Sequence, residues 1–141
     1  MNNVSSFDFR FDLPVTGWQD QSIYTFKGPT VDEMDHYLYL ALDRDIQNAT
    51  LEQYADVKVN IILSSLEKIK ILSDASVSLQ AVFARELILK WSPAIGVSRY
   101  KKYLFVVEDG IGFTFNCDFT QKSFSLVADQ MTAIVAHLVQ K

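Results

Sequence analysis

The sequence predicts an α+β fold in which two long helices pack against a mostly antiparallel β-sheet. Three observations support this. Several segments alternate apolar and polar residues as strands do, two segments carry apolar residues at helical spacing, and Asp109-Gly110 separates two strand-like segments as in a tight hairpin. No strand-helix-strand alternation is repeated, and the 141 residues contain no linker or repeat, so we expect a single domain over residues 1–141.

The amino-terminal third contains three strand-like segments. Residues 7–13 alternate phenylalanine or leucine with charged residues, which predicts a strand with one buried face. A second strand is expected over 21–27, ended by Gly28-Pro29-Thr30, because proline lacks an amide donor and glycine permits a turn. An acidic connector over 31–35 then leads to a third strand over 36–42.

The third strand is apolar on both faces. Leu38, Leu40 and Leu42 point to one side, and Tyr37 and Tyr39 point to the other. Each face must therefore be covered by another element, or one of them is a binding surface.

The rest of the chain supplies the two helices and the remaining strands. One helix is predicted over 51–66, with Thr50 as its N-cap, and the other over 124–138. Arg85 is the single charged exception on an apolar strand face. The remaining strands are predicted over residues 69–73, 77–91, 99–107 and 111–118.

Composition excludes several classes of protein. A 49% hydrophobic content and a single cysteine exclude a disordered chain and a disulfide scaffold. The net charge of −4 argues against nucleic-acid binding.

No segment approaches the roughly 18 consecutive apolar residues of a spanning helix, so no integral membrane span is expected. The first six residues do not resemble a secretory signal, which predicts a cytoplasmic location unless a leader has been removed.

Cations and aromatic residues are interleaved over Arg99–Tyr103. Such a segment could bind phosphate or single-stranded nucleic acid. On a strand, however, Lys102 points away from Arg99 and Lys101, which scatters the charge over two faces. We therefore interpret the segment as a solvated edge strand whose lysines prevent edge-to-edge pairing.

No catalytic, cofactor-binding or metal-binding residues can be assigned, so we do not expect an enzyme. The chain has no Gly-x-Ser-x-Gly motif and only two histidines, of which His36 is interpreted as a surface residue. The acidic residues around Asp32 lack the regular spacing and glycine of a calcium loop. Cys117 is in phase with Phe115 and Phe119 and is interpreted as a small buried hydrophobe.

Several short motifs resemble those of a known family. The chain opens with Leu13-Pro14, Trp18-Gln19-Asp20-Gln21-Ser22-Ile23 and Phe26, followed by a strand that ends Leu42-Asp43-Arg44-Asp45. This opening resembles the DcrB-like family and, within it, the Eag chaperones of type VI secretion. Three later segments agree with the same family: Ala84-Arg85-Glu86-Leu87, Tyr103–Phe115 and Phe124–Leu138.

The resemblance implies a PsbP-like fold and a cytoplasmic homodimer without cofactors. It also implies that the protein shields the hydrophobic amino-terminal segment of a secreted effector. We expect one partly open sheet face, bearing Tyr24, Phe26, Tyr37 and Tyr39, to bind that segment. Alternation places Tyr24 with Phe26 and Tyr37 with Tyr39, each pair on one side of its strand, and their sharing one face depends on the strand register. Two alternatives remain open: the tyrosines are ordinary core residues under a helix, or the protein is a small-ligand-binding or scaffolding module of the DcrB-like family without a role in secretion.

Overall fold

The computed structural model describes residue 11 and residues 13–139 of the chain. The elements, in chain order, are β1 (Ile23–Val31), β2 (Met34–Asp43), α1 (Leu51–Ser65), β3 (Lys70–Leu79), β4 (Val82–Ala94), β5 (Val97–Glu108), β6 (Ile111–Phe119) and α2 (Gln121–Leu138). The strand predicted over 7–13 lies mostly outside the described residues. Of that segment only Phe11 and Leu13 are described, and neither is in a strand.

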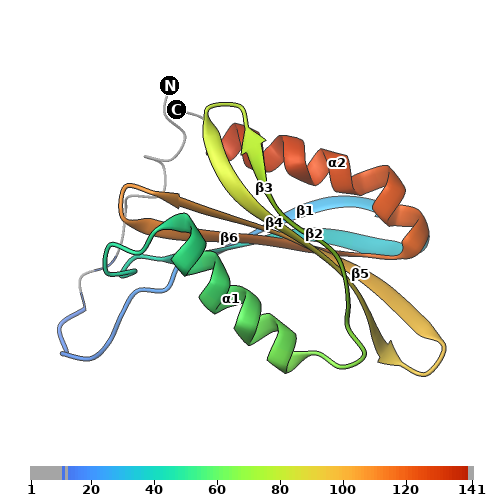
Figure 1. The fold of residues 1–141 in the computed structure, drawn as a ribbon, viewed down its shortest axis with the longest axis horizontal. Coiled ribbons are helices and arrows are strands. Elements are labelled where there is room, and N and C mark those ends of the chain that lie inside the picture. The colour runs from blue at the N-terminus through green and yellow to red at the C-terminus, as the bar shows by residue number, and fades with distance from the viewer. Residues whose placement is uncertain (1–10, 12, 140–141) are drawn as a thin grey trace.

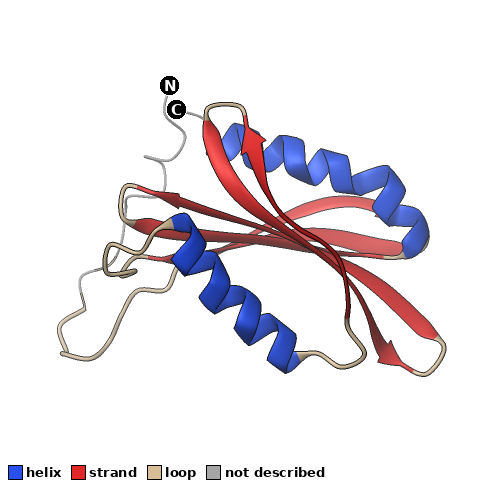
Figure 2. Ribbon diagram, viewed as in Figure 1, coloured by secondary structure: helices blue, strands red, loops and turns tan. Residues whose placement is uncertain are grey.

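The six strands form one antiparallel sheet in the order β1-β2-β6-β5-β4-β3. The helices α1 and α2 lie on opposite faces of this sheet (Figures 1 and 2). The predicted architecture, an antiparallel sheet packed with two long helices, is therefore confirmed. Among the described residues, no helix is both long enough and apolar enough to cross a bilayer.

Both helices begin at a threonine that closes a capping box. Thr50 accepts a hydrogen bond from the amide of Gln53, whose side chain bonds back to the amide of Thr50. Thr120 and Ser123 make the same pair of contacts at the start of α2. These caps satisfy amide donors that have no partner within the helix. The second cap explains why α2 starts at Gln121, about one turn before the predicted residue 124.

One turn agrees with the sequence prediction and two differ from it. The turn that agrees is Asp109-Gly110, where φ is positive at both residues, as the predicted tight hairpin requires. The expected acidic connector is instead a two-residue turn at Asp32-Glu33, also with positive φ at both positions. The single strand predicted over 77–91 is broken by a turn beginning at Gln80, where φ is 61°.

The core is divided into two clusters, one on each face of the sheet. The cluster under α2 contains the three phenylalanines Phe113, Phe115 and Phe119 of β6, packed against Met131 and Val135. The cluster under α1 is smaller and is built from Leu87, Leu89 and Phe105, packed against Ala55 and Val59. Because α1 packs mainly on β4 and β5, its face of the sheet is less covered over β1 and β2.

The interpretation of Arg99–Tyr103 as an edge strand is wrong. These residues lie in β5, which is hydrogen-bonded to β6 on one side and β4 on the other. Lys102 is buried under α2, where its ammonium group lies 3.4 Å from the carboxylate of Glu86 and also contacts the hydroxyl of Thr132. Burial of this charge is tolerated because it is paired and hydrogen-bonded.

Candidate partner-binding surface

The strand register decides which of the predicted binding residues share a face. Tyr24 and Phe26 of β1 are paired with Leu40 and Leu38 of β2, on the side of the sheet where α2 packs. Neighbouring residues of one strand point to opposite faces, whereas directly paired residues point to the same face. Tyr24 and Phe26 therefore flank the α2 cluster, and both are half-buried against it.

Tyr37 and Tyr39 lie on the opposite face. They are paired with Lys27 and Thr25 of β1, and their rings contact each other at a centroid distance of 6.2 Å. Tyr39 is 39% exposed, because α1 packs on the other half of this face. The expectation that all four aromatic residues share one open face is therefore wrong: the structure brings together two pairs, one on each side of the sheet.

An apolar cleft lies beside Phe26, between β1 and α2. Its volume is about 50 Å³, and we call it the β1–α2 cleft. Its lining residues are Phe26, Lys27, Gly28, Pro29, His36, Leu38, Cys117, Val127, Gln130, Met131 and Ile134. Ile134 is 44% exposed at the rim, whereas Leu38, Cys117 and Met131 belong to the buried core. The cleft thus brings a solvent-facing rim next to buried core residues.

Polar contacts join the β1–β2 hairpin to the start of α2 at one end of this cleft. His36 Nδ1 lies 2.9 Å from the carbonyl of Pro29, and His36 Nε2 lies 2.8 Å from the hydroxyl of Ser123. Because a carbonyl only accepts, the Nδ1 atom carries a proton and donates. Asp32, in the hairpin turn, accepts a hydrogen bond from Thr120 at 2.7 Å. These contacts fix the position of β1 relative to α2.

His36 is not the surface residue that the sequence analysis expected. It is 2% exposed and is in phase with Leu38, Leu40 and Leu42 on the face that α2 covers. Its place in that leucine series was the sequence signal that could have identified it as a core residue. Its ring also packs against Phe119, with centroids 5.7 Å apart.

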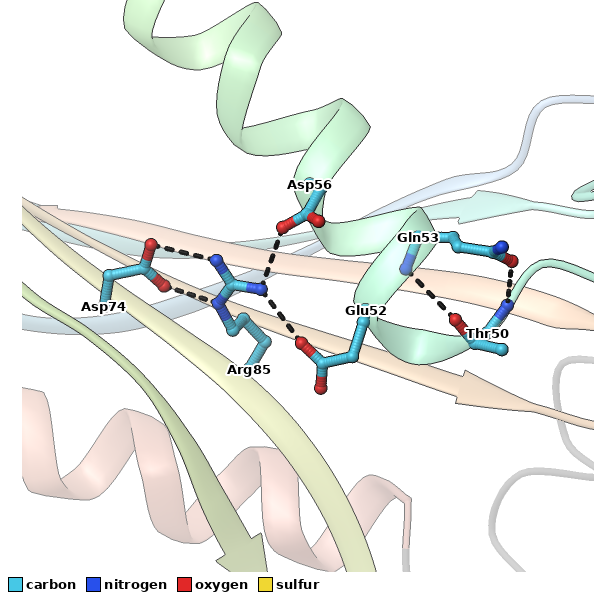
Figure 3. A network of polar contacts seen from close by, with 6 residues as sticks. All are labelled: Thr50, Glu52, Gln53, Asp56, Asp74 and Arg85. Carbon is cyan, nitrogen blue, oxygen red and sulfur yellow. Dashed lines mark hydrogen bonds and ion pairs between the residues drawn. The ribbon is translucent and has the colours of Figure 1, made fainter.

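A network of ionic contacts around Arg85 positions α1 on the other face (Figure 3). The guanidinium makes two hydrogen bonds to Asp74 of β3, and its Nη1 atom lies 3.1 Å from Glu52 and 3.0 Å from Asp56, both on α1. The Arg85 side chain is only 15% exposed. The hydrogen bond from Arg85 lowers the pKa of Asp74 below its usual value. Arg85, the charged exception noted in the sequence, thus joins three elements.

The buried thiol, phenol and hydroxyl groups of the core are poorly suited to act as catalytic nucleophiles. Cys117 is buried, and burial raises the pKa of its thiol to about 12. Such a thiol carries almost no thiolate near neutral pH. Burial likewise raises the pKa of Tyr54 and of Tyr103 to about 12. Ser123, which contacts His36, is fully buried and serves the helix cap. Residue 11 and residues 13–139 include no group of three or more metal-ligand side chains placed to hold an ion.

The fold is similar to that of a solved protein from Pseudomonas aeruginosa. That protein is PA94, described as a candidate regulator of unknown function. The TM-score is 0.73 at 17% sequence identity, and the match covers 89% of this chain and 88% of PA94. This likeness agrees with the expected α+β class, a mostly antiparallel sheet packed with two long helices. At this low identity the likeness concerns the fold alone.

A weaker likeness links the chain to the Ran-binding protein Mog1p of Saccharomyces cerevisiae. The TM-score is 0.46 at 11% identity, with 98% of this chain and 78% of Mog1p covered. A score at this level carries no argument about function. No protein-family model matches the sequence, and no curated protein matches it significantly.

Proposed function

We propose that the protein is a non-catalytic cytoplasmic chaperone or adaptor of the DcrB-like family. In this proposal it shields the hydrophobic amino-terminal segment of a type VI secretion effector and acts as a homodimer. The observation that carries the proposal is the β1–α2 cleft, whose rim residues Phe26 and Ile134 lie between solvent and the core. The resemblance of the sequence motifs to the Eag chaperones is the reason for proposing a secretion effector as the class of client.

The cleft offers a physical reason for a client to bind there. Exposing an apolar segment to water costs about 25 cal/mol for each Å² of apolar surface. Burying a few hundred Å² of that segment against a carrier therefore stabilises the complex by several kcal/mol. A cleft of about 50 Å³ is too small for a whole helix. It suits one anchoring side chain, with the remainder of the client lying along α2 and the edge strand β1.

Each pair of aromatic residues then has a different role. Tyr24 and Phe26 line the side of β1 that faces α2, next to the client. Tyr37 and Tyr39 lie on the other face and do not contact a client bound in the β1–α2 cleft. This assignment replaces the expectation of one four-residue surface and makes the two faces separable by mutation.

The test uses aspartate substitutions on the two helices. The tagged amino-terminal segment of an effector encoded beside this protein is co-expressed with the full chain, and co-purification is measured. Ile134→Asp, at the cleft, should abolish co-purification, because a carboxylate at the rim opposes entry of an apolar side chain. Val57→Asp, at an exposed position on α1, is the matched control and should not. Equal retention of client by the wild-type chain and Ile134→Asp would contradict the proposal.

A further inference from the structure

The two edges of the sheet differ in how well they are protected against pairing with another chain. β1 and β3 are the outermost strands. β1 contains Gly28-Pro29, and its register shifts between Lys27 and Thr30, so its edge is interrupted by a residue without an amide donor. β3 has ten residues and contains neither glycine nor proline. An unprotected edge of this kind can accept a further strand.

The register of β3 shows which of its backbone groups face outward. A two-residue turn joins β3 to β4, and the pair Leu79 and Val82 closes it. Residues of such a closing pair exchange hydrogen bonds, and hydrogen-bonded pairs alternate along an antiparallel ladder. Asp74, Ser76 and Ser78 fall between these pairs, so their N–H and C=O groups point away from β4. Among the described residues, no strand pairs with this side of β3.

A cleft lies beside this edge, on the side of the sheet where α2 packs. Its volume is about 410 Å³, and we call it the β4–α2 cleft. Glu86 and Ile88 of β4 line it, and their partners on β3 are Ala75 and Ser73, which point to the same face. Because both β3 side chains are short, they leave the cleft open toward the outer edge of the sheet. The lining residues are Glu86, Ile88, Lys102, Phe124, Ser125, Ala128 and Asp129.

The β4–α2 cleft offers an unpaired carboxylate. Its only cation, Lys102, is buried and is paired with Glu86 at 3.4 Å. Asp129, on α2, is exposed and forms no ion pair with any described residue. The cleft therefore carries a net negative charge and suits a basic side chain whose apolar stem lies against Phe124 and Ile88.

The other face of the same edge is also acidic. Asp74, Glu52 and Asp56 surround the single guanidinium of Arg85 (Figure 3). Each of these carboxylates is already paired with Arg85, so this face adds net negative charge without an unpaired carboxylate like that of Asp129. The lysine pair Lys70–Lys90 stands at the beginning of β3, outside the stretch over 73–78. Both faces beside that stretch therefore attract a basic segment.

We propose that β3 pairs with an extended basic segment of a partner protein, which adds to the sheet as a further antiparallel strand. The partner residues opposite Asp74, Ser76 and Ser78 exchange backbone hydrogen bonds with β3. The partner residue opposite Ala75 points to the α2 side, where a lysine or arginine side chain extends past the alanine and pairs with Asp129. The negative charge of both faces favours this partner over an acidic segment.

The test measures binding of a fluorescein-labelled peptide of alternating valine and lysine to the full chain by fluorescence anisotropy. In the proposed register the valines are hydrogen-bonded to β3 and the lysines point to the α2 side. Backbone N-methylation of the valines should therefore weaken binding by at least about tenfold, whereas backbone N-methylation of the lysines, whose amides face outward, should not. The two methylated peptides carry the same charge, so the comparison separates strand pairing from electrostatic attraction.

Protein variants test the same contacts. Ser76→Pro removes one outward amide without breaking the ladder to β4 and should weaken peptide binding by at least about tenfold, whereas Ser76→Thr keeps the amide and should bind like the wild type. Asp129→Lys should lose the valine–lysine peptide and bind a valine–glutamate peptide instead. Asp45→Lys makes the same change in net charge in the exposed loop after β2, and as the control it should do neither.

Failure of the wild-type chain to bind the valine–lysine peptide at millimolar concentration would overturn the inference. Equal binding of the N-methylvaline peptide and the unmodified one would do the same, as would equal binding by Ser76→Pro and Ser76→Thr when both are folded by circular dichroism. Self-association of the wild type that Ser76→Pro abolishes would assign this edge to a second copy and contradict the proposal. Ile134→Asp should keep full peptide binding, because the β1–α2 cleft is a separate site, so each of the two proposals can fail without the other.

Discussion

The buried imidazole of His36, on β2, lies 2.8 Å from the hydroxyl of Ser123 in the first turn of α2. This contact joins residues 87 positions apart in the chain and sets the spacing of β2 and α2, both of which contribute residues to the lining of the β1–α2 cleft. The same hydroxyl accepts from the amide of Thr120, so one serine serves both the helix cap and the contact between elements.

Replacing Ser123 by alanine should destabilise the fold. The change removes the partner of His36 Nε2 and one half of the capping box of α2, and we expect a loss of about 1–3 kcal/mol in the free energy of unfolding. Urea denaturation measures the loss. Ser125→Ala, at an exposed serine of the same helix, is the control and should change stability by less than about 0.5 kcal/mol. Equal stability of the two variants would show that the contact with His36 is not structural.

Replacing Arg85 by methionine should destabilise the packing of α1. It leaves Asp74, Glu52 and Asp56 without their shared cation, and we expect a cost of about 1–3 kcal/mol near neutral pH. Because Arg85 lowers the pKa of Asp74, this stabilisation is present above the ordinary carboxyl pKa of 3.8 and disappears as the pH falls through the lowered value. The difference in unfolding free energy between wild type and variant should therefore shrink in acid. A difference that is constant with pH would count against the network.

Gly112→Ala should destabilise the fold through contact with a single side chain. A Cβ atom at position 112 would lie 2.3 Å from the ring atom Cε1 of Tyr54. The hydroxyl of this tyrosine is hydrogen-bonded to the hydroxyl of Thr114 at 2.7 Å. The ring must move, at a cost of about 1–3 kcal/mol. In a Tyr54→Ala background the same substitution should cost much less, and a double-mutant cycle by urea denaturation measures the difference. Additive effects would mean that the ring is not the obstacle.

Cys117 should resist alkylation in the folded protein. Its thiol is buried, and burial raises its pKa to about 12, so little thiolate is accessible near neutral pH. Iodoacetamide labelling followed by mass spectrometry should show no adduct in native buffer and complete labelling in urea. Rapid labelling of the native protein would mean that the β1–α2 cleft opens as far as the core.

The fold class could be predicted because local signals agreed with the global arrangement. Thr50 caps the helix that it was expected to cap, and Asp109-Gly110 forms the expected hairpin turn. The turns at Asp32-Glu33 and Gln80 contain no glycine or proline, so the sequence carried no signal for their positive φ angles.

The candidate site was less predictable, because it depends on strand pairing. Periodicity correctly grouped Tyr24 with Phe26 and Tyr37 with Tyr39, but only the register shows that the two pairs lie on opposite faces. The burial of Lys102 was missed for a similar reason. Its partner Glu86 lies on another strand, and nothing local in the sequence indicates that β5 is central.

The central claim is that a client binds on the α2 side of the sheet and not on the face of Tyr37 and Tyr39. Its most direct test is co-purification of a tagged effector segment with Ile134→Asp and with Tyr39→Asp, both at partly exposed positions. We predict that Ile134→Asp loses the client and that Tyr39→Asp retains it, with both variants folded by circular dichroism. Retention by Ile134→Asp together with loss by Tyr39→Asp would place the client on the α1 face and contradict the account.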